Sequence, residues 1–352
     1  MSPTLFRRLR RLFLLGAPLL ALLTAACTPV LIPAGPPVTT PAVAGDALVM
    51  RDGARLPLRR WLPEGPPRAI LLGLHGFNDA ARNFMEEAAP AFTAAGVAVY
   101  AYDQRGFGAA PHPGIFAGGP SLAADASEAA RLIRARHPGV PLVLLGESMG
   151  GAVLVLSATS ADPPPADGYI LMAPAFWGRE DMPPVMRWGL WLASRTIPLV
   201  GFPGTAGGIV ASDNEEALRR WGRDPLTIKI TRVDAASGLV DLMDAAVAEV
   251  PECCRTALHP GAAPVLVLLG AKDRIIPTRV ARRVVRGMRD DQQESVAYYE
   301  EGWHLLLRDH QRAVVARDIL AWMAAPAAPL PSGADLAARD WLAKEEAKAA
   351  GR

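Results

Sequence analysis

Cysteine is scarce in this chain: Cys27, Cys253 and Cys254 are the only three in 352 residues. So few cysteines exclude a disulfide framework, and none of them stands at the spacing of a metal site. A disulfide between Cys253 and Cys254 would be strained, because neighbouring Cα atoms lie about 3.8 Å apart whereas disulfides span about 4.4–6.8 Å. We therefore interpret this pair as two small apolar residues in a loop.

A surplus of charge of one sign is missing as well. The formal net charge is +2, and the first 26 residues carry Arg7, Arg8, Arg10 and Arg11 without an acidic residue, which leaves −2 for the rest of the chain. The lack of a basic surplus argues against a nucleic-acid partner. With 51% hydrophobic and 20% charged residues, the chain is typical of a globular protein with one sizeable α/β domain and an insertion.

A membrane-spanning run is not apparent at the N-terminus, where the apolar stretch Leu12 to Leu23 falls short of the roughly 20 residues that a bilayer requires. This stretch follows the arginines and leads into Thr24-Ala25-Ala26-Cys27, the pattern of a cleaved export signal. The small residues before Cys27 resemble a bacterial lipoprotein signal. We therefore expect residues 1–26 to be a signal peptide and Cys27 to be lipidated, with plain secretion or a periplasmic location as the alternative.

Two further features bear on export and anchoring. In a Gram-negative lipoprotein, a residue other than aspartate after the lipidated cysteine implies sorting to the outer membrane. Thr28 at this position therefore indicates an outer-membrane protein that faces the periplasm. The pair Arg10-Arg11 leaves the twin-arginine export route open. Residues 27–46 are rich in proline and alanine and are expected to form an extended tether.

Apolar segments alternate with amphipathic stretches over most of the remaining chain. Apolar runs such as Ala69–Leu74 and Val97–Tyr102 alternate with helical patterns over Ala81–Ala95 and Leu122–Arg136. This alternation predicts an α/β fold whose mostly parallel sheet of about eight strands carries helices on both faces. We assign residues 47–172 and 264–325 to this core.

The alternation stops after the sixth predicted strand, Gly168–Met172. Residues 173–263 contain no clear strand but include helical patterns at Pro183–Ile197 and Asp234–Val250, so we predict an inserted helical cap over the carboxyl edge of the sheet. Residues 326–352 are expected to form a C-terminal linker and a surface helix.

The segment Gly146-Glu-Ser148-Met-Gly150 lies between an apolar run and a helical run. Side-chain-free glycines on both sides of a serine allow a sharp turn from strand to helix that exposes the hydroxyl of Ser148. This turn also directs the N–H of Met149 toward the place where negative charge would develop, and the N–H of Phe77, after His75-Gly76, is the natural second donor.

A serine nucleophile requires a base and an acid that orients it. Of six histidines, His304 lies in the loop after the last predicted strand, while the other five have simple structural interpretations. Asp273 directly follows an apolar strand, whereas its competitors Asp241 and Asp244 lie within a predicted cap helix. The order Ser148, Asp273, His304 is the one expected of an α/β-hydrolase.

The chain resembles the α/β-hydrolase superfamily and, within it, the monoacylglycerol lipase and lysophospholipase branch. The segments that carry the resemblance are His75-Gly-Phe, Tyr102-Asp-Gln-Arg-Gly-Phe-Gly108, Leu145-Gly-Glu-Ser-Met-Gly-Gly151, Gly270-Ala-Lys-Asp273 and Gly302-Trp-His304. The resemblance implies Ser148 as nucleophile, His304 as base, Asp273 as its orienting acid, and Phe77 and Met149 as oxyanion donors, without a metal or cofactor.

Two departures from this branch bear on the substrate. Glu147 stands where lipases of the branch usually carry histidine, and Phe77-Asn78-Asp79 replaces the polar residues that follow His-Gly in glycerol-binding members. These changes weaken the expectation of glycerol recognition but leave ester hydrolysis intact.

The sequence therefore predicts a serine hydrolase that cleaves carboxylic esters of lipid-like substrates through an acyl-enzyme, with an acyl-chain pocket under the aromatic cap and a membrane anchor at Cys27. Two alternatives stay open. One is thioesterase, amidase or perhydrolase chemistry on the same triad. The other is a non-catalytic lipoprotein of the cell envelope that binds lipid.

Overall fold

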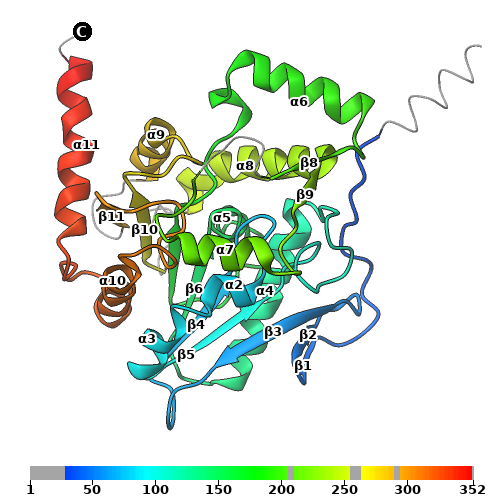
Figure 1. Cartoon of the computed structure of the whole chain (residues 1–352). Helices are drawn as coiled ribbons and strands as arrows, with labels where there is room; N and C mark the ends of the chain where they lie inside the picture. The colour runs from blue at the N-terminus through cyan, green and yellow to red at the C-terminus, as the bar shows by residue number, and fades with distance from the viewer. Residues whose placement is uncertain (1–27, 205–209, 254–262, 289–293, 351–352) are drawn as a thin grey trace, which may run out of the picture.

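The computed structural model describes residues 28–204, 210–253, 263–288 and 294–350 (Figure 1). The predicted signal peptide, Cys27 and Cys254 lie outside these residues. Cys253 carries a free thiol. Among the helices of the described ranges, none is both long and apolar enough to cross a bilayer.

A nine-stranded sheet forms the centre of the described chain. The first three strands run antiparallel to their neighbours, and the other six are parallel to one another. In spatial order they are β1 (Ala42–Ala44), β2 (Ala47–Val49), β3 (Arg55–Trp61), β5 (Val97–Tyr102), β4 (Ala69–Leu74), β6 (Leu142–Glu147), β7 (Gly168–Met172), β10 (Val265–Gly270) and β11 (Glu294–Tyr299).

Helices cover both faces of this sheet, as the alternating pattern predicted (Figure 1). The helices outside the cap are α2 (Ala81–Met85), α3 (Ala89–Ala94), α4 (Gly119–Arg136), α5 (Met149–Ala158), α9 (Thr278–Met288), α10 (Arg312–Ala324) and the C-terminal helix α11 (Ala334–Ala350). The single helix predicted over Ala81–Ala95 is wrong: Pro90 lies in the first turn of α3 and cannot donate the hydrogen bond that would continue α2.

Successive side chains of the central strands point to opposite faces and enter two separate hydrophobic cores. Leu72 and Leu144 belong to the core under α4 and α5, whereas their neighbours Leu71 and Leu145 pack with Trp322 of α10 on the other face. Strands buried on both faces are therefore apolar throughout, which is why they were recognisable in the sequence.

The sheet has one strand more than the sequence indicated. Ala42–Ala44 pairs with Ala47–Val49 across a tight turn at Gly45, whose φ is +60°. This short edge strand lies in the stretch assigned to the tether, and its presence makes the cap follow the seventh strand of the chain rather than the sixth. The core thus begins before residue 47.

The inserted cap contains η1 (Arg179–Asp181), α6 (Pro184–Thr196), α7 (Glu215–Arg223) and α8 (Val233–Cys253), together with a two-stranded ribbon of β8 (Gly201–Pro203) and β9 (Ile230–Arg232). Helices α6 and α8 confirm two predicted segments, while α7 and the ribbon were not predicted. Helix α8 packs on α5, and α6 lies on the outer side of α8 (Figure 1).

The residues before β1 run along the domain in an extended path. The N–H of Ile32 donates to the carbonyl of Phe116 at 3.1 Å, and the N–H of Ala34 donates to Ser121 Oγ at 3.0 Å. Further along, the N–H of Val38 donates to the carbonyl of Arg51 at 2.7 Å. The predicted tether is therefore packed against the domain from Val30 onward.

Candidate functional site

The parallel strands bring the predicted site residues to one edge of the sheet. Residues 75–77 follow β4, Ser148 follows β6, Asp273 follows β10 and His304 follows β11. Because the carboxyl ends of parallel strands meet at the same edge, these loops gather beneath the cap.

Ser148 lies at a strained turn between β6 and α5. Its φ of 52° and ψ of −112° are unfavourable for a residue with a side chain. The turn depends on its glycines: a Cβ at Gly150 would lie 2.2 Å from the carbonyl oxygen of Leu74, and one at Gly146 would lie 2.4 Å from Gly150. Ser148 itself remains partly exposed while both its neighbours are buried.

Asp273 and His304 meet directly. Nδ1 of His304 lies 2.7 Å from Oδ2 of Asp273, and Oδ1 of the same carboxylate accepts the N–H groups of Ile275 and Ile276 at 2.7 and 3.0 Å. The carboxylate is thus held by its own loop. The imidazole is oriented with Nε2 left for other contacts.

The protonated form of His304 is stabilised by its surroundings. Burial by itself lowers the pKa of this imidazole, but the charge and hydrogen bond of Asp273 and the charge of Glu147 outweigh that effect and leave the pKa above its ordinary value. Arg308 acts in the opposite direction. This environment favours the imidazolium that a general base becomes.

The structure does not join Ser148 to His304: among the described side chains, no hydrogen bond links Ser148 Oγ to the imidazole. Such contacts are often loose in unliganded enzymes and tighten when substrate binds. The His75-Gly76 turn does lie against the serine, since a Cβ at Gly76 would be 3.5 Å from Ser148 Cβ. The N–H of Met149 belongs to the first turn of α5, where no acceptor within the helix is available.

A buried ionic cluster, which the sequence did not reveal, lies behind the serine. Arg308 donates to Oδ2 of Asp79 at 2.7 Å and to Oε1 of Glu147, and all three side chains are buried. Burial raises the pKa of Glu147, and Arg308 offsets only part of that rise. The available signals were Arg308 four residues after His304 and the acidic residue before Ser148.

The same cluster reaches the cap. Oδ1 of Asp79 accepts the indole N–H of Trp221 in α7 at 3.0 Å. Next to it, Nδ2 of Asn78 donates to Thr231 Oγ1 of β9 at 2.6 Å. The loop that follows His75-Gly76 therefore adds polar contacts with the cap to the packing of α8 on α5.

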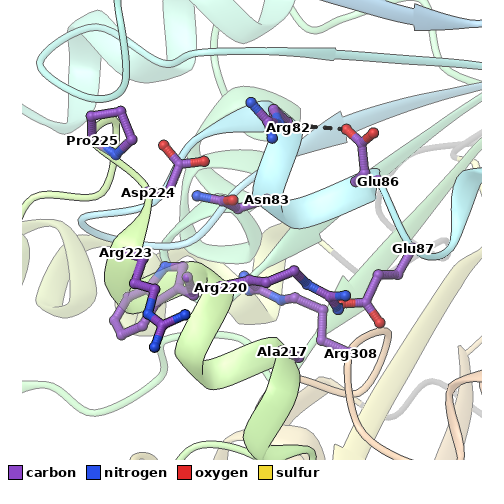
Figure 2. Close-up of a pocket in the computed structure, with 11 residues that line it drawn as sticks. Arg82, Asn83, Glu86, Glu87, Ala217, Arg220, Arg223, Asp224, Pro225 and Arg308 are labelled. Carbon is purple, nitrogen blue, oxygen red and sulfur yellow. Dashed lines mark hydrogen bonds and ion pairs between the residues drawn. The ribbon is translucent and has the colours of Figure 1, made fainter.

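A cavity of about 490 Å³ lies between core helix α2 and cap helix α7. Figure 2 shows Arg82 and Asn83 of α2, with Glu86 directly after this helix, opposite Arg220 and Arg223 of α7. Trp221 and Arg308 also line it, so this space adjoins the ionic cluster at its inner end.

The remaining candidate residues have structural roles. Asp241 and Asp244 both form ion pairs with Arg179, and His75 accepts the N–H of Gln104 through Nε2 at 3.0 Å. Arg105 is paired with Asp52 and Asp125, so the Asp103-Gln-Arg-Gly segment belongs to a structural ion-pair network. Within the described ranges, no group of three His, Cys, Asp or Glu side chains is placed to hold a metal ion.

Known lipases are similar to this chain in sequence. The chain is 24% identical over 272 residues to the monoacylglycerol lipase of Mycolicibacterium smegmatis, covering 77% of this chain and 93% of that protein. It is 26% identical over 282 residues to the monoglyceride lipase of Mus musculus, covering 78% of this chain and 89% of that protein.

Solved structures share the fold at lower identity. The monoacylglycerol lipase of Paleococcus ferrophilus matches with a TM-score of 0.59 and 22% identity, covering 76% of this chain and 98% of that chain. A soluble variant of the Saccharomyces cerevisiae monoglyceride lipase in complex with a substrate analog matches with a TM-score of 0.62 and 18% identity, covering 84% of this chain and 97% of that chain. These similarities confirm the α/β-hydrolase fold.

The sequence profile of the family described as serine aminopeptidase, S33, matches residues 65–311. This match spans more than half of the chain and includes every strand from β4 onward. The chain therefore belongs to the serine aminopeptidase S33 family and is an α/β-hydrolase, a serine hydrolase of the lipase and esterase type.

Proposed function

We propose that this protein hydrolyses carboxylic esters of lipid-like substrates, of the monoacylglycerol, lysophospholipid or simple carboxylic ester kind, through an acyl-enzyme on Ser148. The observation that carries the proposal is the pairing of Asp273 with His304 at 2.7 Å, on the sheet edge where Ser148 occupies a strained turn. The names of the relatives support the substrate class, since several are monoacylglycerol or monoglyceride lipases.

In this mechanism His304 removes the proton from Ser148 as its oxygen attacks the ester carbonyl carbon. Asp273 keeps Nδ1 of the imidazole protonated and stabilises the imidazolium that forms. The N–H groups of Phe77 and Met149 donate to the oxyanion of the tetrahedral intermediate. The imidazolium then protonates the departing alcohol, and water attacks the acyl-enzyme with His304 again as base.

The residues around the serine favour an apolar acyl group. Phe77 packs edge-on against Phe107, with ring centroids 5.4 Å apart, and near Phe116 of the same cluster. The carboxylates of Glu147 and Asp79 form ion pairs with Arg308. This part of the site is therefore suited to contact the apolar surface of a substrate.

A substrate panel tests this proposal. Purified wild type and Ser148→Ala are compared on a series of esters of increasing acyl length, on matched thioesters and on short peptides. We expect the esters to be preferred and Ser148→Ala to be inactive on all of them. A preference for peptides or thioesters would contradict ester hydrolysis and indicate amidase or thioesterase activity on the same triad. Tight lipid binding without turnover would identify a lipid-binding protein instead.

We further propose that Cys27 is lipidated after removal of residues 1–26 and that this anchors the protein in the bacterial outer membrane, facing the periplasm. The lipoprotein-like residues before Cys27 support this proposal. A Cys27→Ala variant is expected to leave the membrane fraction. If it stays there in the same amount as the wild type, Cys27 is not the anchor.

A further inference from the structure

An extended strap, residues 30–34, crosses the domain before β1, in the blue chain that runs between the cap and β1 in Figure 1. The N–H groups of Val30, Ile32 and Ala34 all donate to the domain, at 3.0, 3.1 and 3.0 Å. Between the first two, Leu31 is 47% exposed, and its N–H has no acceptor among the described residues. Successive residues of an extended chain point in opposite directions, so three specific hydrogen bonds fix the path of the strap.

The acceptors of these bonds belong to both parts of the protein. Val30 donates to Oδ2 of Asp234, in the first turn of cap helix α8. Ile32 donates to the carbonyl of Phe116, in the core loop that precedes α4. Asp234 is buried and also accepts from Arg232 of β9, so it is a fixed and charged acceptor. The strap therefore ties the beginning of α8 to the core.

Phe116 is the residue at which the cap and the core meet. Its ring is buried, and the backbone of α8 lies directly against it, because a Cβ at Gly238 would be 2.5 Å from Cδ1 of the ring. Asp234 and Gly238 are four residues apart and so share one face of α8. The face of the helix that contacts the Phe116 ring is therefore also bonded to the strap that holds the Phe116 backbone.

The Phe116 ring also reaches the proposed site. Its centroid lies 6.4 Å from the ring of Phe77, which carries the proposed second oxyanion donor, and 6.4 Å from the ring of Phe107. Phe77 is half-buried, whereas the other two rings are buried. Of these three rings, Phe77 is thus the one placed to contact a substrate, and Phe116 packs against it from the protein interior.

We propose that this strap determines which acyl chains the enzyme prefers. By holding the Phe116 backbone and the first turn of α8 together, it keeps the apolar wall at Phe77 in one place. Val30 and Ile32 are then specificity-determining residues that act through their backbone N–H groups. The proposal rests on the ester hydrolysis proposed above and deepens it, since it assigns the preference for acyl length to a segment far from Ser148 in the sequence.

The expected consequence depends on the length of the acyl chain. Each methylene group that is no longer buried weakens binding roughly fourfold. A long acyl chain covers more of the apolar wall than an acetyl group does. Release of the strap is therefore expected to weaken the use of long-chain esters and to leave that of acetyl esters almost unchanged.

Proline substitutions remove single N–H groups from an extended chain. The test variant is Val30→Pro with Ile32→Pro, which loses the bond to the cap and the bond to the core loop. Leu31→Pro is the matched control, because it removes the N–H that has no acceptor. Pro29 and Pro33 already flank these three positions, so proline suits the local backbone.

The measurement is kcat and KM on water-soluble esters of increasing acyl length. In the double proline variant, we expect the ratio of kcat/KM for the long-chain ester to that for the acetyl ester to fall roughly tenfold, mainly through a higher KM for the long ester. Leu31→Pro is expected to keep the wild-type ratio. So is Val30→Ala with Ile32→Ala, which shortens the side chains but retains both N–H groups.

An unchanged ratio in the double proline variant would overturn the proposal. An equal loss on all esters would overturn it as well, because a strap with a merely structural role would lower the amount of active enzyme without changing its preference. If the double variant does not fold, Val30→Pro and Ile32→Pro are measured singly, and each is expected to lower the ratio.

Hydrogen exchange measures the tie between the strap and the cap. Peptides that cover the first turns of α8 are expected to exchange faster in the double proline variant than in the wild type or in Leu31→Pro, because Asp234 has lost its bond to the strap. Equal exchange in all three proteins would overturn the proposal.

The strap and the proposed function fail in different ways. If Ser148→Ala hydrolyses the esters as the wild type does, the proposed function is refuted. If Ser148→Ala is inactive while the proline variants keep the wild-type preference for acyl length, the strap proposal alone is refuted.

Discussion

Nδ1 of His304 lies 2.7 Å from Oδ2 of Asp273, and the other oxygen of that carboxylate is held by two backbone N–H groups of its own loop. The carboxylate can therefore orient the imidazole without moving itself. An acid that is fixed by its own loop and bonded to Nδ1 of the base keeps one tautomer of the imidazole available.

Asp273→Asn is expected to reduce kcat by roughly 10³–10⁴-fold, because an asparagine can hold the imidazole in the wrong tautomer and lacks the charge that stabilises the imidazolium. The residual activity should show an acidic limb at lower pH, since the charge of Asp273 raises the pKa of His304. The measurement is kcat/KM against pH. A limb that moves to higher pH would contradict the assignment of this pair.

The glycines of the serine turn provide a second prediction. Gly150→Ala brings a methyl group to within 2.2 Å of the Leu74 carbonyl oxygen, so we expect a loss of roughly 1–3 kcal/mol in the free energy of unfolding and a displaced serine. Urea unfolding and ester turnover measure the two effects.

Gly189→Ala in α6 is the control for this change. A Cβ there meets nothing within 4 Å, and alanine favours a helix more than glycine does. Its unfolding free energy should be unchanged or slightly higher. Equal destabilisation by both substitutions would show that the close approach at Gly150 is not what limits the turn.

The contact between Asn78 and Thr231 provides a third prediction, on the seating of the cap. Thr231→Val keeps the shape of the side chain but removes the acceptor for Asn78 Nδ2, which lies 2.6 Å away and is buried. We expect a loss of about 1–2 kcal/mol in stability. We also expect a lower kcat, because Asn78 follows the proposed oxyanion donor Phe77.

Thr159→Val separates these two effects. Thr159 donates to the Val155 carbonyl at the end of α5 opposite to Ser148, so its loss should affect stability with kcat unchanged. If Thr231→Val also leaves kcat at the wild-type value, the cap ribbon does not position the loop after His75-Gly76.

The sequence was most informative where a residue type suited to catalysis comes after a predicted strand. Ser148, Asp273 and His304 each come after a predicted strand, so their placement on one edge of a parallel sheet could be predicted without knowing the packing. The contact between Asp273 and His304 confirms that placement for two of them. The catalytic roles of all three remain predictions.

What the sequence could not show depends on contacts between distant loops. The Arg308 cluster joins the loop after β4, the last residue of β6 and the loop after β11, and no periodicity links Asp79 to Arg308. Helix α7 was missed because its Glu215–Arg223 segment is mostly charged and has only Ala217 buried. Strand β1 was missed because a three-residue alanine and valine edge carries almost no pattern.

The most direct test of the central claim is the site of covalent labelling by a fluorophosphonate, mapped by mass spectrometry in the wild type and in Ser148→Ala. The account predicts a single label on Ser148 that a monoacyl ester competes away. It also predicts an unlabelled Ser148→Ala protein whose ester turnover is lower by at least about 10⁴-fold. A label at another residue, or turnover by Ser148→Ala near the wild-type rate, would contradict it.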